Sequence, residues 1–170
     1  MTWQIPSDRP YFKLEHFVGS VERLAWAKVN GCPWDVRTCA AIAMYGDLAV
    51  LQWARELECP WNAATSHCAA SRGDLEMLKW VRQRECPWNA VTCAAVALGG
   101  HLAVLQWARE HGCPWDERTC NHAVHYLSLP GNIQVLRWAR EHGAPWDAAA
   151  RDLAATRGYT DDLPLSLSET

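Results

Sequence analysis

Apolar and polar positions along this chain follow the spacing of short amphipathic helices. Residues 48–56 read Leu-Ala-Val-Leu-Gln-Trp-Ala-Arg-Glu. The large apolar side chains of this segment fall on one broad stripe of a helix, whereas Gln52, Arg55 and Glu56 fall on the side that faces water. The pattern predicts a helix that buries one face and ends near Glu58.

The preceding segment predicts a second short helix. Asp35 is a natural N-cap, residues 36–45 are rich in alanine, and Gly46 suits the left-handed conformation that ends many helices. Asp47 then caps the helix of residues 48–56. We expect the same caps along the chain: Asn62, Asn89, Asp116 and Asp147 for the first helix of a unit, and Asp74, His101 and Asn132 for the second.

This two-helix unit recurs with a fixed period. The intervals between equivalent residues are 27, except for one of 31 between Gly100 and Gly131. Such a period is typical of a stack of supersecondary units that bury their faces against neighbours. We therefore predict an all-α solenoid of about six two-helix repeats. Three series of residues mark the period: Gly19, Gly46, Gly73, Gly100, Gly131 and Gly158; Trp26, Trp53, Trp80, Trp107 and Trp138; and Trp34, Trp61, Trp88, Trp115 and Trp146.

The repeat resembles the ankyrin repeat. Residues 100–110, GHLAVLQWARE, correspond to the family's GHLEVVKLLLE, and residues 112–116, GCPWD, to its GADVN. The family's T-P pair is not kept, and Thr38 lies one position late. A leucine-rich repeat also allows this period, but the alternating leucines of its strand are missing. The chain is most similar to divergent ankyrin-like arrays that carry Cys-Pro-Trp in each unit.

The resemblance also implies shortened loops. An ankyrin unit has about 33 residues, and the alignment places the missing ones between Asp35 and Thr38, where the family builds its β-hairpin tip. We expect an ankyrin-like solenoid without this tip. Two ladders of tryptophan, one from the loops and one from the second helices, would then supply cohesion, because each buried aromatic removes about 150–250 Å² from water.

The ends of the chain differ from the repeated unit. We predict a single repeat domain over residues 1–170, with a capping repeat at 1–31, core repeats at 32–146, a C-terminal cap at 147–162 and a short tail at 163–170. Tyr11, Phe12, Leu14 and Phe17 lead into the first cap, whereas Asp161, Asp162 and Pro164 prevent a further second helix.

Composition and charge narrow the expected partners. The formal net charge is −3 and the pI is about 6.1, which gives no electrostatic reason to expect nucleic acid or an anionic membrane. The chain has no apolar stretch long enough to span a bilayer, and no signal-peptide pattern at its start. We therefore expect a cytoplasmic, monomeric protein.

The eight cysteines follow the repeat. One position holds cysteine in most units and Ala144 in the last, and another holds cysteine in three units and Ser66 in a fourth. A position that exchanges cysteine with alanine or serine selects for small size, so we predict structural thiols and no disulfide framework. The first position is Cys32, Cys59, Cys86 and Cys113, and the second is Cys39, Cys93 and Cys120.

Catalytic and cofactor signatures are missing from the sequence. There is no phosphate-binding glycine loop, no H-E-x-x-H and no G-x-S-x-G, so we expect neither an enzyme nor a cofactor. The one concentration of reactive side chains is Cys120, His122 and His125. A thiol with two imidazoles is able to bind zinc or respond to oxidation, but on a helix these three share a face only in part. A metal- or redox-responsive array is therefore an alternative function.

Variation between repeats points to the interaction surface. The first helices vary at Ala40, His67, Ala94 and Asn121, and at two positions near their ends, whereas the helix-core positions hardly change. In ankyrin arrays the first helices line the concave face, so the resemblance implies a protein-binding strip there, unless the array is a purely architectural spacer. Leu127 and Leu129, in the insertion, either fill a gap or contact the partner. The predicted partner-binding residues are Met44, Tyr45, His67, Arg72, Leu98, Asn121, His125, Tyr126, Leu127 and Leu129.

Overall fold

The computed structural model describes residues 16–128 and 131–159. Within these ranges the chain forms ten helices and no strand. In chain order they are α1 (Val21–Val29), α2 (Val36–Tyr45), α3 (Leu48–Glu56), α4 (Ala63–Ser71), α5 (Leu75–Gln83), α6 (Ala90–Gly99), α7 (Leu102–Glu110), α8 (Glu117–His125), α9 (Asn132–Glu141) and α10 (Ala148–Thr156).

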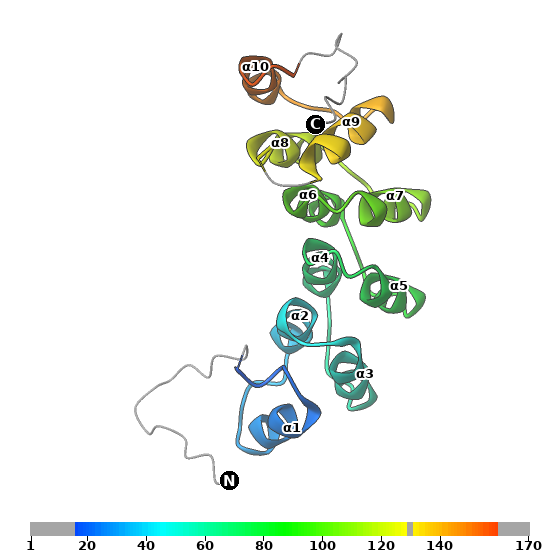
Figure 1. Ribbon diagram of the computed structural model, residues 1–170. Coiled ribbons are helices and arrows are strands. Elements are labelled where there is room, and N and C mark those ends of the chain that lie inside the picture. Colours follow the sequence, from blue (N-terminus) through cyan, green and yellow to red (C-terminus); the bar gives the residue numbers. More distant parts are fainter. Residues whose placement is uncertain (1–15, 129–130, 160–170) are drawn as a thin grey trace, which may run out of the picture.

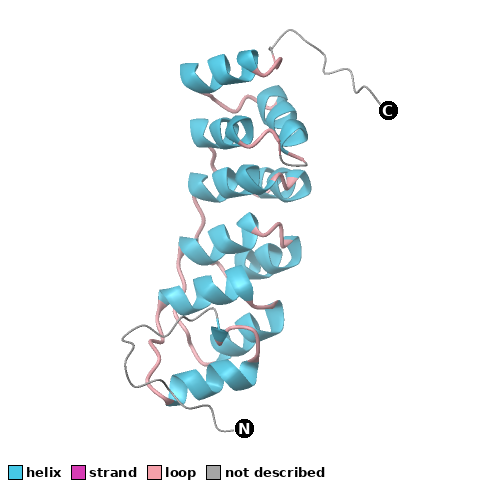
Figure 2. Cartoon of the chain, turned by 60° about the vertical axis from the view of Figure 1, so that its left-hand side comes forward, coloured by secondary structure: helices cyan, strands magenta, loops and turns pink. Residues whose placement is uncertain are grey.

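The helices stack in two parallel rows (Figures 1 and 2). The first helices of the units, α2, α4, α6, α8 and α10, form one row, and α1, α3, α5, α7 and α9 form the other. Successive helices of the first row pack on each other, and α2, α4, α6 and α8 also pack on the second helix of their own unit. The predicted helical solenoid is thereby confirmed. Its core lies between the rows, where side chains such as Ile42, Leu51 and Leu78 are fully buried.

The predicted N-caps position the first helices. Asp35 accepts a hydrogen bond from the backbone N–H of Arg37 at 2.8 Å, and Asn62, Asn89, Asp116 and Asp147 cap the later first helices in the same way. Thr38 returns a bond to the cap, because its hydroxyl accepts from the backbone N–H of Asp35 at 3.3 Å. The threonine that departs from the ankyrin pattern is thus the partner of a capping box.

The predicted left-handed ending at Gly46 is wrong. Its φ is −94° and its backbone is extended. Glycine is needed there for space, since a Cβ would lie 2.5 Å from the carbonyl oxygen of Val18 and 3.0 Å from the side chain of Ile42. The first repeat therefore packs directly on the end of α2, and a larger residue would separate them.

Two of the predicted second-helix caps are also wrong. Asp47 and Asp74 cap α3 and α5 as expected. In contrast, Asn132 is the first residue of α9 and is fully buried, while Gly131 occupies the cap position. His101 stands at the cap of α7 but makes no capping hydrogen bond. Both side chains reach toward a neighbouring first helix instead.

The arginine at the end of α3, α5, α7 and α9 does not simply face water, as predicted for Arg55. Its guanidinium lies 4.1 Å from the ring centre of Trp61 in the next loop, and it donates a hydrogen bond to the carbonyl of Cys59. The same two contacts recur in the next units through Arg82, Arg109 and Arg140. Cation–π stacking and a bond to a buried carbonyl together fix each loop to the preceding helix.

The loop tryptophans pair with the helix tryptophans. Trp61 meets Trp80 edge to face, with ring centres 5.9 Å apart, and Trp88 meets Trp107 at 6.0 Å. Equivalent pairs join Trp34 to Trp53 and Trp115 to Trp138. The tryptophans are half-buried and pack against the core. The two predicted ladders therefore meet in one aromatic seam along the stack.

Some predictions on the ends fall outside the described residues. They concern Tyr11, Phe12 and Leu14 at the start, the tail after residue 159, and Leu129 in the insertion. Phe17 is described, and its ring stacks on Trp26 with centres 5.9 Å apart.

Two glutamates occupy a backbone conformation that glycine adopts more easily. Glu58 and Glu85 have φ of 56° and 61°, at the position where other units carry Gly31, Gly112 and Gly143. We expect Glu85→Gly to raise the free energy of unfolding by about 0.5–1 kcal/mol, because left-handed strain exceeds the entropy that glycine adds to the unfolded chain. Urea unfolding of the wild type and the Glu85→Gly variant would measure this difference in free energy.

The reciprocal change is the matched control for this prediction. A Cβ at Gly112 would meet nothing within 4 Å, so Gly112→Glu isolates the cost of the positive φ. It should lower stability by a similar amount. A loss of stability in Glu85→Gly would mean that the glutamate side chain contributes more than its backbone costs.

Candidate interaction surface

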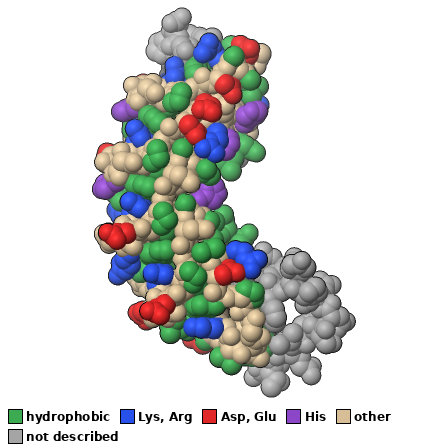
Figure 3. All heavy atoms as spheres, turned by 180° about the vertical axis from the view of Figure 1, so that it is seen from behind, with side chains coloured by type: hydrophobic (Ala, Val, Ile, Leu, Met, Phe, Trp, Pro, Cys, Tyr) green, Lys and Arg blue, Asp and Glu red, His purple; other side chains and the backbone are tan. Residues whose placement is uncertain are grey.

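The first-helix row lies on the hollow side of the curved stack (Figure 1). The space-filling view in Figure 3 shows the same hollow from behind, with histidine side chains along its edge. The helices that vary most between repeats therefore share one continuous concave surface. This arrangement brings the predicted site residues of α2, α4, α6 and α8 to one side of the molecule.

Two tyrosines are large exposed side chains at the ends of first-row helices. Tyr45, at the end of α2, is 59% exposed, and Tyr126, just after α8, is 45% exposed. His125 is also exposed, and Met44 and Leu98 are half-buried nearby at the ends of their helices. These members of the predicted set therefore face solvent in whole or in part.

The polar members of the set also contact other repeats. The imidazole Nδ1 of His67 lies 3.4 Å from the carbonyl oxygen of Val91 in α6. The amide of Asn121 donates to the carboxylate of Asp147 at 2.7 Å, across the α8–α10 interface. These side chains hold neighbouring first helices in register, in addition to lining the hollow.

Arg72 connects two repeats in a different way. Its guanidinium donates to the carbonyl oxygens of Gly46 at 2.6 Å and Ala43 at 3.4 Å, at the C-terminal end of α2. Arg157 makes the equivalent contacts to Val124 at 2.7 Å and His125 at 3.2 Å, at the end of α8. Carbonyls at a helix end lack partners within the helix, so each arginine satisfies groups of the preceding unit.

Other side chains perform this role where the arginine is missing. The Nε2 of His101 lies 3.1 Å from the carbonyl oxygen of Ser71 at the end of α4, and the amide of Asn132 donates to the carbonyl of Ala97 in α6 at 3.1 Å. A side chain at Gly99 would collide with the His101 ring, at 2.4 Å from its Nε2. This shared capping has no signal in the repeat pattern, because different residues at different repeat positions provide it.

The structure corrects the prediction for Ala94 and decides between the two predicted roles of Leu127. Ala94 is fully buried, so it does not belong to the exposed variable positions; α6 carries more apolar side chains than its neighbours and packs them on both sides. Leu127 is 7% exposed and belongs to the core. Its burial favours the first of the two predicted roles, the filling of a gap beside the insertion.

The hollow holds a shallow depression beside His67. It has a volume of about 230 Å³ and is lined by Ala63, Ala64, His67, Asn89 and Val91. Small side chains at the start of α4 leave this space against the cap of α6. Its size and openness suit the side chain of a protein ligand better than an enclosed small molecule.

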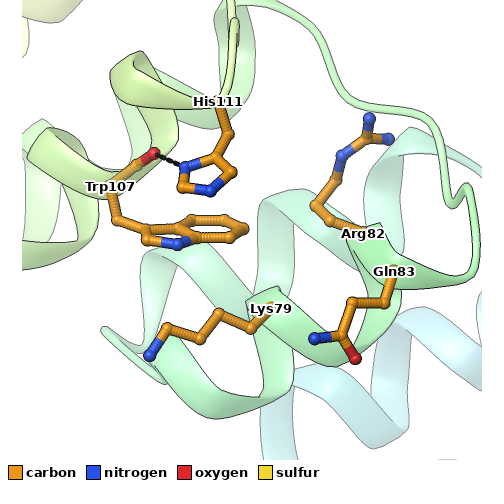
Figure 4. Close-up of a pocket in the computed structure, with 5 residues that line it drawn as sticks. All are labelled: Lys79, Arg82, Gln83, Trp107 and His111. Carbon is orange, nitrogen blue, oxygen red and sulfur yellow. Dashed lines mark hydrogen bonds between the residues drawn. The ribbon is translucent and has the colours of Figure 1, made fainter.

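A second depression lies on the other row, between α5 and α7 (Figure 4). The His111 ring stacks on Trp107 with centres 4.2 Å apart, and its Nδ1 donates to the Trp107 carbonyl at 2.8 Å. The cations are already engaged, because Lys79 pairs with Glu76 at 2.9 Å and Arg82 stacks on a loop tryptophan. The depression, of about 320 Å³, is lined by Lys79, Arg82, Gln83, Trp107 and His111.

The alternative metal site is not assembled. Cys120 is fully buried and donates to the carbonyl of Ala144 at 3.8 Å, while the Nδ1 of His122 lies 3.1 Å from the carbonyl oxygen of Ala94 and His125 is exposed. Among the residues that the structure describes, no group of three or more His, Cys, Asp or Glu side chains is placed to hold a metal ion. The three side chains point to different surroundings.

No protein-family model matches this chain, and no curated protein is found to be similar to it. None of the helices in the described residues is both long enough and apolar enough to cross a membrane.

Proposed function

We propose that this chain is a non-enzymatic protein-binding array of ankyrin-like repeats, which acts in the cytoplasm as a monomer. The partner docks in the hollow of the first-helix row. The observation that carries this proposal is the exposure of Tyr45 and Tyr126, at the same repeat position three units apart, at the ends of two helices of the first row. Large aromatic side chains of this kind dominate binding energy at protein interfaces.

The contacts between repeats support this proposal. The hydrogen bonds of Arg72, His101, Asn132 and Arg157 each join one unit to the next. A surface ordered in advance loses less entropy when a partner binds. The affinity would then come from a few anchors, for which the tyrosines and His125 are the best placed.

Affinity capture from lysate tests the proposal. The bait is the wild-type chain beside a Tyr45→Ala, His125→Ala, Tyr126→Ala variant. Arg72 is left intact because it caps α2. We expect one specific protein to be captured by the wild type and reduced by at least about tenfold with the variant, since anchor residues each contribute about 2 kcal/mol or more.

A matched control removes apolar side chains from the other row. Val29 and Leu57 are 86% and 41% exposed at the ends of α1 and α3, and Val29→Ala with Leu57→Ala should leave capture unchanged. Circular dichroism establishes that both variants are folded. Equal capture by all three baits would favour the architectural spacer, and stoichiometric zinc in the purified protein would favour the metal-responsive array.

A further inference from the structure

The two cysteine positions of the repeat meet across the interfaces between units. The thiol of Cys39, in α2, donates to the carbonyl of Cys59, in the loop before α4, at 3.6 Å. In return, the thiol of Cys59 donates to the carbonyl of Asp35, at the cap of α2, at 3.7 Å. Both side chains are fully buried. Two thiols from neighbouring repeats therefore lie side by side.

A second interface carries the same pair. Cys93, in α6, and Cys113, in the loop before α8, are fully buried, and the thiol of Cys113 donates to the carbonyl of Asn89 at 3.6 Å. A side-chain hydrogen bond between Cys93 and Cys113 is the largest cause of the pKa shifts of both thiols, so the two sulfurs are close. The two cysteines of each pair are 20 residues apart in sequence, whereas equivalent positions of successive units are 27 apart. A comparison of equivalent positions therefore does not reveal the pairing.

The neighbouring interfaces hold one thiol each at these positions. Cys86 lies beside Ser66 and donates to the carbonyl of Asn62 at 3.5 Å. Cys120 faces Ala144. Among the described residues there are thus two thiol pairs and two single-thiol interfaces with the same backbone arrangement, which supply controls for any reaction that needs two sulfurs.

The members of each pair differ in acidity. The pKa of Cys59 is lowered, first because the Cys39 thiol can donate to the Cys59 sulfur once that sulfur is a thiolate, and further by the nearby Arg55 guanidinium, against the effect of burial. The same hydrogen bond and burial raise the pKa of Cys39. Cys113 is lowered and Cys93 raised for the same reasons, with Arg109 as the cation. Thiolate is the reactive form, so Cys59 and Cys113 are the expected nucleophiles.

We propose that Cys39–Cys59 and Cys93–Cys113 are modification sites at which a peroxide forms disulfides between neighbouring repeats. The Cys59 thiolate attacks one oxygen of hydrogen peroxide and the O–O bond breaks. The sulfur becomes a sulfenic acid, and the departing hydroxide takes up a proton and leaves as water. The Cys39 sulfur then attacks the sulfenic sulfur, its thiol proton leaves with the hydroxyl as a second water, and the S–S bond forms. Two electrons pass from the thiols to the peroxide.

Burial sets the condition for this reaction. The sulfurs are closed to solvent, so peroxide reaches them only when the interface between two repeats opens. In a stacked array each repeat contacts only its neighbours, so one interface can open while the others stay closed. The product joins α2 to the loop before α4, or α6 to the loop before α8. It therefore limits further opening and is expected to raise the midpoint of thermal unfolding.

Peptide mapping tests the proposal. The reduced chain is treated with hydrogen peroxide, the remaining thiols are alkylated, and the protein is cut with trypsin. Cleavage after Arg55 separates Cys39 from Cys59, and cleavage after Arg109 separates Cys93 from Cys113. We expect these two cross-links at least about tenfold more often than any other pair, because disulfides need closely placed Cβ atoms.

Native interfaces of the same chain provide the control variants. Cys39→Ser copies the Ser66 position and Cys59→Ala copies the Ala144 position, so either should abolish the first cross-link and retain the second. Oxidation should raise the unfolding midpoint of the wild type and leave that of Cys39→Ser with Cys93→Ser unchanged.

The wild-type cross-link map is decisive even if a variant does not fold. Cross-links distributed among all eight cysteines would overturn the proposal. Sulfinic and sulfonic acids without cross-links, or reaction confined to the half-buried Cys68, would overturn it as well.

Discussion

Replacing Trp80 by alanine is expected to lower the free energy of unfolding by about 3 kcal/mol. The indole packs edge to face on Trp61 with ring centres 5.9 Å apart, and the Arg84 guanidinium lies 4.2 Å from its centre. It is half-buried, so the cost lies at the lower end of the range for tryptophan. In a stack stabilised by neighbours, a loss at the centre weakens the repeats on both sides.

Urea unfolding followed by circular dichroism measures this loss. Trp80→Phe keeps an aromatic ring against Trp61 and should cost clearly less than Trp80→Ala. An unchanged midpoint in the alanine variant would mean that the aromatic seam covers the core without stabilising it.

Gly131→Ala is expected to destabilise the array by about 3 kcal/mol or more, although it adds a single methyl group. Gly131 precedes α9 with a φ of 91°, and a Cβ there would lie 2.2 Å from the carbonyl oxygen of Gly100. Both the left-handed backbone conformation and the steric clash with this carbonyl make any side chain at position 131 unfavourable. Because the obstacle is backbone, relief would require α9 to move away from the α6–α7 turn.

Gly143→Ala is the matched control for this prediction. Gly143 has a φ of 81°, and a Cβ there would meet nothing within 4 Å. Its substitution should cost about 1–2 kcal/mol through the backbone alone. If thermal unfolding shows equal losses for the two variants, the close approach of Gly131 to Gly100 does not hold the units together.

The helices and most of their caps could be predicted from the sequence because these features are local. Asp35 and its equivalents precede alanine-rich segments, and the apolar stripe of residues 48–56 identifies its buried face directly. The capping partner Thr38 is equally local, three residues from the cap. Short-range chemistry of this kind is independent of how the units stack.

The contacts between units could not be predicted in this way. On its own helix, Arg55 is predicted to be a solvated side chain. Its contact with Trp61 forms only when the next loop packs against the end of α3. The available signal was that an arginine recurs two residues after four of the five helix tryptophans, with Lys28 after Trp26. Asn132 gave no such signal, because the insertion before it shifts its role from a cap to a buried contact with Ala97.

The candidate site was predicted in part. Variation between repeats identified Tyr45 and Tyr126, which are exposed at the ends of α2 and α8. The same criterion selected Arg72 and Asn121, which bridge neighbouring units as well. A variable position is therefore either a surface contact or a side chain adapted to its particular neighbour, and sequence variation alone does not separate the two.

Site-specific photo-crosslinking tests the central claim most directly, namely that the hollow of the first-helix row binds a protein. A benzophenone amino acid replaces Tyr45, Tyr126 or, on the other row, Leu57, and the folded proteins are irradiated in lysate. The account predicts that positions 45 and 126 cross-link to the same protein and that position 57 does not. Cross-linking from position 57 alone, or equally from all three positions, would contradict it.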